Sequence, residues 1–402
     1  MTVDEKTSRY RYVILMITWI AYAAASASRL SIAPLAPYMI PDLRLARAEL
    51  GLFYSFTYLG YICAQVPAGW FIDRFSIRSL LVIMQIALAG TNMLMSVIST
   101  PVQGWLVEFL TGIEAGSLIA CATKAVVIWF PTGERATAMG LQQASLNLGG
   151  MGAAFLLPII AVTQGWRASF AVLSGIAIVS SVLSLVFFKQ PLPATRATQP
   201  AASKSTFREV LMNRDIVLVA IGAMLFGIIE FCLIMNLVLF LHESILLSAV
   251  VASSYLAVVE GAGALGKPLF GLLSDRLLEG RRRPVLIAVG IACFTCSVWT
   301  TFMLRQSSSW VMTMVLALFG LAALGWGGLF LALTAELARK ELSGIATGFG
   351  LTLTSMGIII GPPVFGSIVD RTGSYELAWA FVAICAAVGT AFFSLTKEER
   401  RM

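Results

Sequence analysis

Ionisable side chains interrupt several long apolar stretches of the sequence. Arg29 lies late in the first stretch, Glu114 midway along the fourth, Glu230 in the seventh, and Glu260 and Lys267 in the eighth. A charge at the centre of a bilayer costs about 2.5–3.5 kcal/mol on insertion scales, so such a residue normally faces a cavity or pairs with another group. A buried cation can bind a carboxylate or phosphate, and a buried carboxyl can exchange a proton. The pattern predicts a buried anion site beside proton-exchanging acids.

Arg29 has two interpretations. A helix rises about 1.5 Å per residue, so Arg29 lies roughly 27 Å from Arg11, on the outer half of the predicted membrane span. Its planar guanidinium can hold an anion with two parallel hydrogen bonds, which is the substrate role we expect. The alternative is a structural partner for a buried glutamate.

The buried acids also have two interpretations each, one functional and one structural. Glu114 is either a proton carrier or a static partner of Arg29, and an anion that competes for Arg29 would leave Glu114 free to take up a proton. Glu230 and Glu260 are alternative proton sites, with hydrogen bonds between packed helices as the other interpretation. Glu108 lies near an outer span end, where we expect it to be solvated.

Lys267 is a second candidate for binding the substrate anion. It follows Glu260 by two helical turns, and a lysine in place of arginine removes the two-pronged geometry while keeping the charge. Lys124 lies nearer the cytoplasmic face, where its long side chain is expected to reach the interface.

The composition is that of an integral membrane protein. Of 402 residues, 58% are hydrophobic and 12% are charged, whereas soluble domains carry about 25% charged residues. Each crossing needs about 20 apolar residues. Soluble, collagenous, disordered and disulfide-scaffold classes are therefore excluded.

The apolar runs predict an all-α membrane fold with twelve transmembrane helices. Most Lys and Arg residues fall in alternate connecting segments, which by the positive-inside rule places both termini in the cytoplasm. We expect the chain in the plasma membrane, of the bacterial inner-membrane type. The predicted spans are residues 12–38, 50–72, 79–99, 103–130, 137–162, 168–188, 215–241, 247–273, 284–304, 309–335, 344–368 and 377–395.

The chain is predicted to consist of two similar halves. Residues 189–214 are polar, basic and rich in Pro, Ala, Ser and Thr, and indicate a cytoplasmic linker between six-helix bundles at 1–188 and 215–402. Short motifs recur between the halves at offsets of about 200 residues, which is a parallel internal repeat of the kind found in transporters.

One of these repeated motifs suggests a gate. A carboxylate and guanidiniums at the cytoplasmic helix ends can bridge to neighbouring helices and hold one conformation closed. The alternative is a simple topology signal. The candidate gating residues are Gly69, Asp73, Arg74 and Arg78 in the first half and Gly271, Asp275 and Arg276 in the second.

Several other functions are disfavoured. The net charge of +7 comes from cations scattered between apolar runs, so no nucleic acid partner is expected. The six cysteines lie in apolar stretches and His242 is the only histidine, so we expect neither a metal site nor a cofactor. The chain lacks His pairs and a G-x-S-x-G elbow, and we expect no enzyme activity.

Twelve spans, a basic central loop and the repeated G-x-x-x-D-R motif resemble the major facilitator superfamily over essentially the whole chain. The segments QVPAGWFIDRFSIR, WFPTGERATAMGL and GSIVDRTGS are similar to its anion/cation symporter branch, and KPLFG at Lys267 is similar to monocarboxylate and oxalate carriers. The resemblance implies a major facilitator fold, with Arg29 and Glu114 matching residues of the symporter branch.

Together these features favour a secondary active transporter that couples symport of a small organic anion of the carboxylate type to protons by alternating access. An efflux antiporter of a drug or metabolite, or a non-transporting membrane sensor of the same fold, is the alternative. The expected partners are the substrate anion, protons and the lipid bilayer, and the expected state is monomeric.

Overall fold

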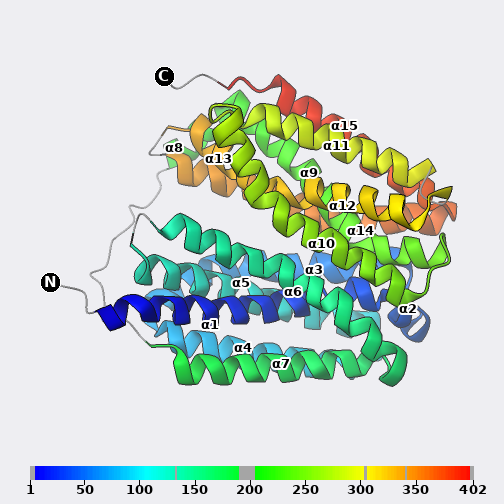
Figure 1. Cartoon of the computed structure of the whole chain (residues 1–402), viewed down its shortest axis with the longest axis horizontal. Helices are drawn as coiled ribbons and strands as arrows, with labels where there is room; N and C mark the ends of the chain where they lie inside the picture. Colours follow the sequence, from blue (N-terminus) through cyan, green and yellow to red (C-terminus); the bar gives the residue numbers. More distant parts are fainter. Residues whose placement is uncertain (1–4, 132–133, 190–203, 303–305, 340–341, 399–402) are drawn as a thin grey trace. The chain divides into compact units, whose positions relative to one another are not determined.

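The computed structural model describes residues 5–131, 134–189, 204–302, 306–339 and 342–398 (Figure 1). All regular secondary structure within these ranges is helical, which confirms the predicted all-α class. Contacts along the chain define two compact units: unit 1 comprises Met1–Leu45 and Phe56–Ala197, and unit 2 comprises Ala46–Ser55 and Thr198–Met402.

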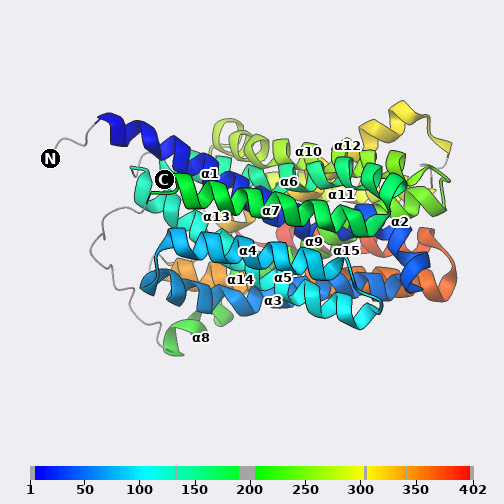
Figure 2. The same ribbon diagram turned by 90° about the horizontal axis from the view of Figure 1, so that it is seen from below.

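Unit 1 contains the first seven helices, apart from the start of α3, which clusters with unit 2. Their bounds are α1 Glu5–Arg29, α2 Ile32–Leu43, α3 Arg47–Arg74, α4 Ile77–Met95, α5 Pro101–Trp129, α6 Arg135–Gln164 and α7 Trp166–Phe187. α4 and α7 run side by side in both views (Figures 1 and 2).

Unit 2 contains the remaining helices. Their bounds are α8 Lys204–Met212, α9 Arg214–Glu243, α10 Ala249–Leu272, the π-helical turn η1 Leu273–Leu277, α11 Arg283–Phe302, α12 Ser309–Gly325, α13 Gly327–Leu337, α14 Ser343–Thr372 and α15 Tyr375–Leu395. α8 lies inside the predicted linker, of which residues 190–203 fall outside the described ranges.

Within the described residues, eleven helical segments are long and apolar enough to cross a membrane. The remaining predicted span is α3, whose 28 residues include polar side chains at Thr57, Tyr58, Tyr61 and Gln65. The predicted set of twelve long helices is therefore present, with α3 carrying polar side chains among its apolar ones.

The first predicted span, residues 12–38, lies within one candidate membrane span, Arg9–Leu43, which consists of two helices because α1 ends at Arg29 and α2 begins at Ile32. Pro34 has no backbone N–H to donate to the carbonyl of Leu30, and its ring crowds that carbonyl. The break leaves Arg29 at the C-terminus of α1, where a cation complements the helix dipole. The tenth predicted span is interrupted in the same way at Trp326, between α12 and α13.

Glycines bring the helices of unit 1 close together. A Cβ on Gly60 of α3 would lie 1.9 Å from the carbonyl oxygen of Phe109, and one on Gly112 of α5 would lie 1.9 Å from that of Thr57. Only glycine permits this approach of two backbones. The α3–α5 contact therefore fixes Thr57 beside the part of α5 that carries the acids.

Candidate functional site

Arg29 is buried in unit 1, with 4% of its surface exposed. Its Cζ lies 5.4 Å from the ring centroid of Tyr58 and 5.8 Å from that of Tyr61, both on α3. Aromatic faces attract a guanidinium, more strongly where water is excluded, and they restrict its orientation. The pair of tyrosines therefore restricts the position of the guanidinium, whose fork can hold an anion with two parallel hydrogen bonds.

Glu114 is buried on α5, and the hydroxyl of Thr91 on α4 lies 2.8 Å from its Oε2. The same hydroxyl lies 3.1 Å from the carbonyl oxygen of Leu88. A hydroxyl has a single hydrogen, so it can donate to only one of the two. When Thr91 donates to Leu88, a protonated Glu114 can donate to Thr91, and when Glu114 is ionised, Thr91 can donate to it. The carboxyl is thus accommodated in both protonation states.

Glu108 is also buried, with 1% of its surface exposed, so the expectation that it is solvated is wrong. α5 begins at Pro101, which places Glu108 two turns inside the helix, on the side that packs against α3. The Thr57 hydroxyl donates to Glu108 Oε2 at 2.7 Å. Unit 1 therefore holds two buried carboxyls and a buried guanidinium.

The candidates of unit 2 lie on α9 and α10. Trp326 donates through Nε1 to Glu230 Oε2 at 3.2 Å, which the break between α12 and α13 makes possible. Glu260 is 1% exposed and Lys267 is half-buried two turns further along α10. Glu230 thus forms a hydrogen bond between packed helices, as its alternative interpretation expects.

The first predicted gate lies at the junction of α3 and α4. Arg74 places its Cζ 3.9 Å from the ring centroid of Trp70, and Arg78 donates to the carbonyl oxygen of Leu185 on α7. A Cβ on Gly69 would meet no described atom within 4 Å. The side chain of Asp73 lies outside the described part of the chain.

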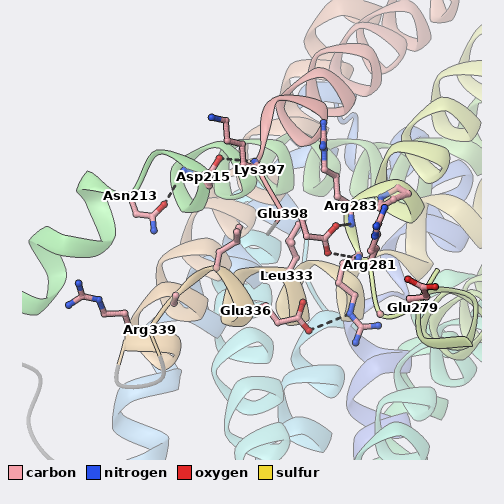
Figure 3. Close-up of a pocket in the computed structure, with 15 residues that line it drawn as sticks. Asn213, Asp215, Glu279, Arg281, Arg283, Leu333, Glu336, Arg339, Lys397 and Glu398 are labelled. Carbon is pink, nitrogen blue, oxygen red and sulfur yellow. Dashed lines mark hydrogen bonds and ion pairs between the residues drawn. The ribbon is translucent and has the colours of Figure 1, made fainter. Parts of the chain in front are cut away.

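Unit 2 contains a cavity of about 1180 Å³ that is lined in part by Arg282, a residue that contacts the second predicted gate (Figure 3). Arg282 forms an ion pair with Asp275, donates to Ser274 Oγ at 2.9 Å and lies 3.5 Å from Glu336 Oε1. Glu398 accepts the backbone N–H of Arg282 at 2.6 Å, and so caps the start of α11. Arg282 rather than Arg276, which is exposed, ties η1, α11 and α13 together.

A family model described as Major Facilitator Superfamily matches residues 18–362. The chain belongs to this superfamily. It is therefore an integral membrane protein. Its fold and its relatives are those of transporters and not of enzymes.

Two curated relatives align with this superfamily member over nearly their whole length. The probable sulfoacetate transporter SauU of Cupriavidus necator is 25% identical and covers 94% of this chain and 92% of its own. The probable galactarate/D-glucarate transporter GudP of Escherichia coli K12 is 23% identical and covers 96% of this chain and 92% of its own. Both are named for small organic anions, which agrees with the resemblance to the anion/cation symporter branch.

Among solved structures, a bacterial homologue of the human lysosomal transporter Spinster has a TM-score of 0.80 to this superfamily member at 15% identity. It covers 96% of this chain and 97% of its own. At this identity the likeness concerns the fold alone.

The groups that surround the charged residues were not predicted from the sequence. Tyr58, Tyr61 and Thr57 occur within five positions on α3, and their polar atoms in an otherwise apolar helix are a signal that could have identified them. Thr91 and Trp326 have no such signal, because single threonines and tryptophans are common in membrane helices.

Proposed function

We propose that this transporter carries a small organic anion of the carboxylate type together with protons by alternating access. The observation that carries the proposal is the buried Arg29, which lies over the rings of Tyr58 and Tyr61 in the same unit as the buried acids Glu108 and Glu114. A cation in an apolar interior needs a counter-charge, which an anionic substrate supplies. The names of the relatives support this substrate class.

In this proposal Arg29 holds the anionic group of the substrate and Lys267 contributes a second positive charge. Glu114 exchanges the proton, because its hydrogen bond with Thr91 suits both protonation states. Glu230 and Glu260 are the alternative proton groups in unit 2. Glu230 is the weaker of the two, since Trp326 already donates to it.

The moving bodies are proposed to be the six-helix bundles 1–188 and 215–402, joined by 189–214. Both termini are placed in the cytoplasm, the membrane is the bacterial inner membrane, and the protein acts as a monomer. The motif residues Gly69, Asp73, Arg74, Arg78, Gly271, Asp275 and Arg276 mark the cytoplasmic gates, and Arg282 provides the contacts of the second gate.

We expect Arg282→Gln to change the conformational balance more than Asp275→Asn. Asp275 has 58% of its side chain exposed, and ion pairs of exposed groups contribute only about 0–1 kcal/mol. The side chain of Arg282 is 16% exposed and contacts two helical elements, η1 and α13. Each variant is combined with Leu337→Cys in a protein without its native cysteines, and Leu337 lines the cavity. The rate at which a thiol reagent labels this cysteine reports how accessible the cavity is. Equal labelling of the two variants would mean that the Arg282 contacts do not act as a gate.

Uptake into proteoliposomes tests the proposed substrate class. Sulfoacetate, galactarate and D-glucarate are supplied as radiolabelled probes, with cationic drugs as the comparison set and empty liposomes as the control. We expect an inward proton gradient to drive accumulation of at least one acid, and a protonophore to abolish it. Gradient-driven expulsion of the cationic drugs would favour the antiporter. Saturable binding of an acid without flux would favour the sensor.

A further inference from the structure

An apolar groove of about 250 Å³ lies within unit 1, between α5, the end of α3 and the start of α4. Three of the side chains that line it are buried: Ile72 of α3, Leu80 of α4 and Cys121 of α5. Ser117 of α5 also lines it, and its hydroxyl donates to the carbonyl oxygen of Ile113 at 2.8 Å. Because this hydroxyl is already hydrogen-bonded, the buried side of the groove suits an apolar ligand.

The other side of the groove opens onto the outer surface of these helices. Phe71 of α3, Phe75 directly after that helix and Ile83 of α4 line it, and they are 43%, 54% and 54% exposed. α4 and α5 are candidate membrane spans, and a patch of large exposed apolar side chains on such helices is a membrane contact. The groove is therefore continuous with the surface that the bilayer covers, and the apolar molecules that surround this surface are lipid acyl chains.

The groove follows the long axis of α3. Ala68 and Phe75 both line it and are seven residues apart, which is roughly 10 Å at 1.5 Å per residue. The N–H of Phe75 donates to the carbonyl oxygen of Phe71 at 2.8 Å, so the helical spacing continues to Phe75. Membrane helices are tilted only about 20° from the bilayer normal, along which acyl chains also run. A chain can therefore lie lengthwise in the groove, with its headgroup near the end of α3.

A cation lies beside the groove at this end. Arg74, the last residue of α3, is exposed, and its Cζ lies 3.9 Å from the ring centroid of Trp70. The Trp70 ring in turn meets the ring of Phe71 edge-on, with 5.0 Å between their centroids, and Phe71 lines the groove. Tryptophan at the end of a membrane helix lies at headgroup level, and a guanidinium can bind a phosphate with two parallel hydrogen bonds. The cation and the apolar groove therefore match the two parts of a phospholipid.

We propose that this groove binds an anionic phospholipid, with one acyl chain between α3, α4 and α5 and the phosphate on Arg74. The site requires that the chain spans a membrane, which follows from its superfamily, and it does not depend on the transported substrate. On the proposed topology the end of α3 lies at the cytoplasmic leaflet, whose anionic lipids attract cations next to membrane helices. Arg74 thereby binds lipid in addition to belonging to the first predicted gate.

Photolabelling of the full chain in nanodiscs tests the site. Discs of phosphatidylcholine contain a trace of phosphatidylglycerol or phosphatidylcholine with a diazirine in its acyl chain, and mass spectrometry locates the lipid that illumination attaches. We expect labelling at Ser117 and Cys121, and Cys121 is diagnostic because it is only 1% exposed. One cation near a membrane surface changes the affinity for an anionic lipid by about fivefold, so phosphatidylglycerol should label about fivefold more than phosphatidylcholine.

A pair of arginine variants tests the headgroup contact. Arg74→Gln should remove the preference for phosphatidylglycerol and retain labelling of the groove by both lipids. Arg9→Gln is the matched control, since Arg9 is an exposed cation near the start of α1, a helix that does not line the groove. This variant should keep the wild-type preference.

A pair of isoleucine variants tests occupation of the groove itself. Ile83→Trp places a larger ring at the opening of the groove and should lose most of the labelling at Cys121. Ile86→Trp is the matched control, because Ile86 is 58% exposed on the same helix but is not among the residues that line the groove. Both positions are exposed, so neither substitution disturbs the packed interior of unit 1.

Three results would overturn the proposal. The first is a folded wild-type protein with no lipid attached at Ser117 or Cys121. The second is equal labelling by the two lipids, or a preference that survives in Arg74→Gln, because Arg74 would then not hold the headgroup. The third is the same labelling of Cys121 in Ile83→Trp and Ile86→Trp. Since the readout is the attached lipid, failure of the proposed anion transport would leave each of these outcomes unchanged.

Discussion

Replacing Arg29 with lysine should lower the affinity for the transported anion by about ten- to hundredfold while leaving the protein folded. A hydrogen bond to a charged group typically contributes about 1.5–3 kcal/mol, and lysine retains the charge but loses one of two parallel bonds. It also loses the contact of the guanidinium with the rings of Tyr58 and Tyr61, whose centroids lie 5.4 and 5.8 Å from the Arg29 Cζ. Initial uptake rates over a range of substrate concentrations provide the measurement.

Arg167→Lys is the matched control for this variant. Arg167 belongs to the same unit and pairs with Asp42, but 42% of its side chain is exposed. An exposed pair contributes little, so uptake by Arg167→Lys should stay close to that of the wild type. Equal affinities in Arg29→Lys and wild type would remove Arg29 from the substrate site.

Gly112→Ala should destabilise the protein by about 1–3 kcal/mol, the usual cost of overpacking a tight interface. The added Cβ would lie 1.9 Å from the carbonyl oxygen of Thr57, so α3 and α5 must move apart. That movement also separates the Thr57 hydroxyl from Glu108. We therefore expect the rate of substrate uptake to fall together with the thermal stability of the protein. The fraction of monodisperse protein that remains after heating, measured by size-exclusion chromatography, reports the change.

Gly90→Ala is the control, because a Cβ on Gly90 of α4 meets no described atom within 4 Å. Alanine is favoured over glycine in a helix by about 1 kcal/mol, so this variant should be at least as stable as the wild type. If Gly112→Ala and Gly90→Ala denature at the same temperature, the close α3–α5 contact does not contribute to stability.

The fold could be predicted from the sequence because membrane insertion imposes a simple pattern. Long apolar runs and the distribution of Lys and Arg identify the spans, and the repeated motifs identify the superfamily. The breaks near Ser31 and Trp326 were harder to predict, since membrane helices often tolerate Pro and Gly without interruption. Both breaks matter, because they position Arg29 and Trp326.

The site was only partly predictable, because burial depends on which face of a helix meets a neighbour. Position along α5 suggests that Glu108 is near water, whereas its face packs against α3 at a glycine contact. Arg29 and Glu114 could be identified from the sequence, because placing a charged side chain inside a membrane span costs free energy. The sequence could not identify the threonine and tyrosine partners, which come from two other helices, α3 and α4.

The most direct test of proton-coupled anion symport is proton movement that the substrate itself drives. Proteoliposomes containing the wild-type protein and a pH-sensitive dye in the lumen are prepared with no pH gradient, and an acid that the uptake assay identifies is added outside. The lumen should become acidic, with a much smaller change in Arg29→Lys and none in empty liposomes. Uptake of the acid with no change in lumenal pH, or with the lumen becoming alkaline, would contradict it.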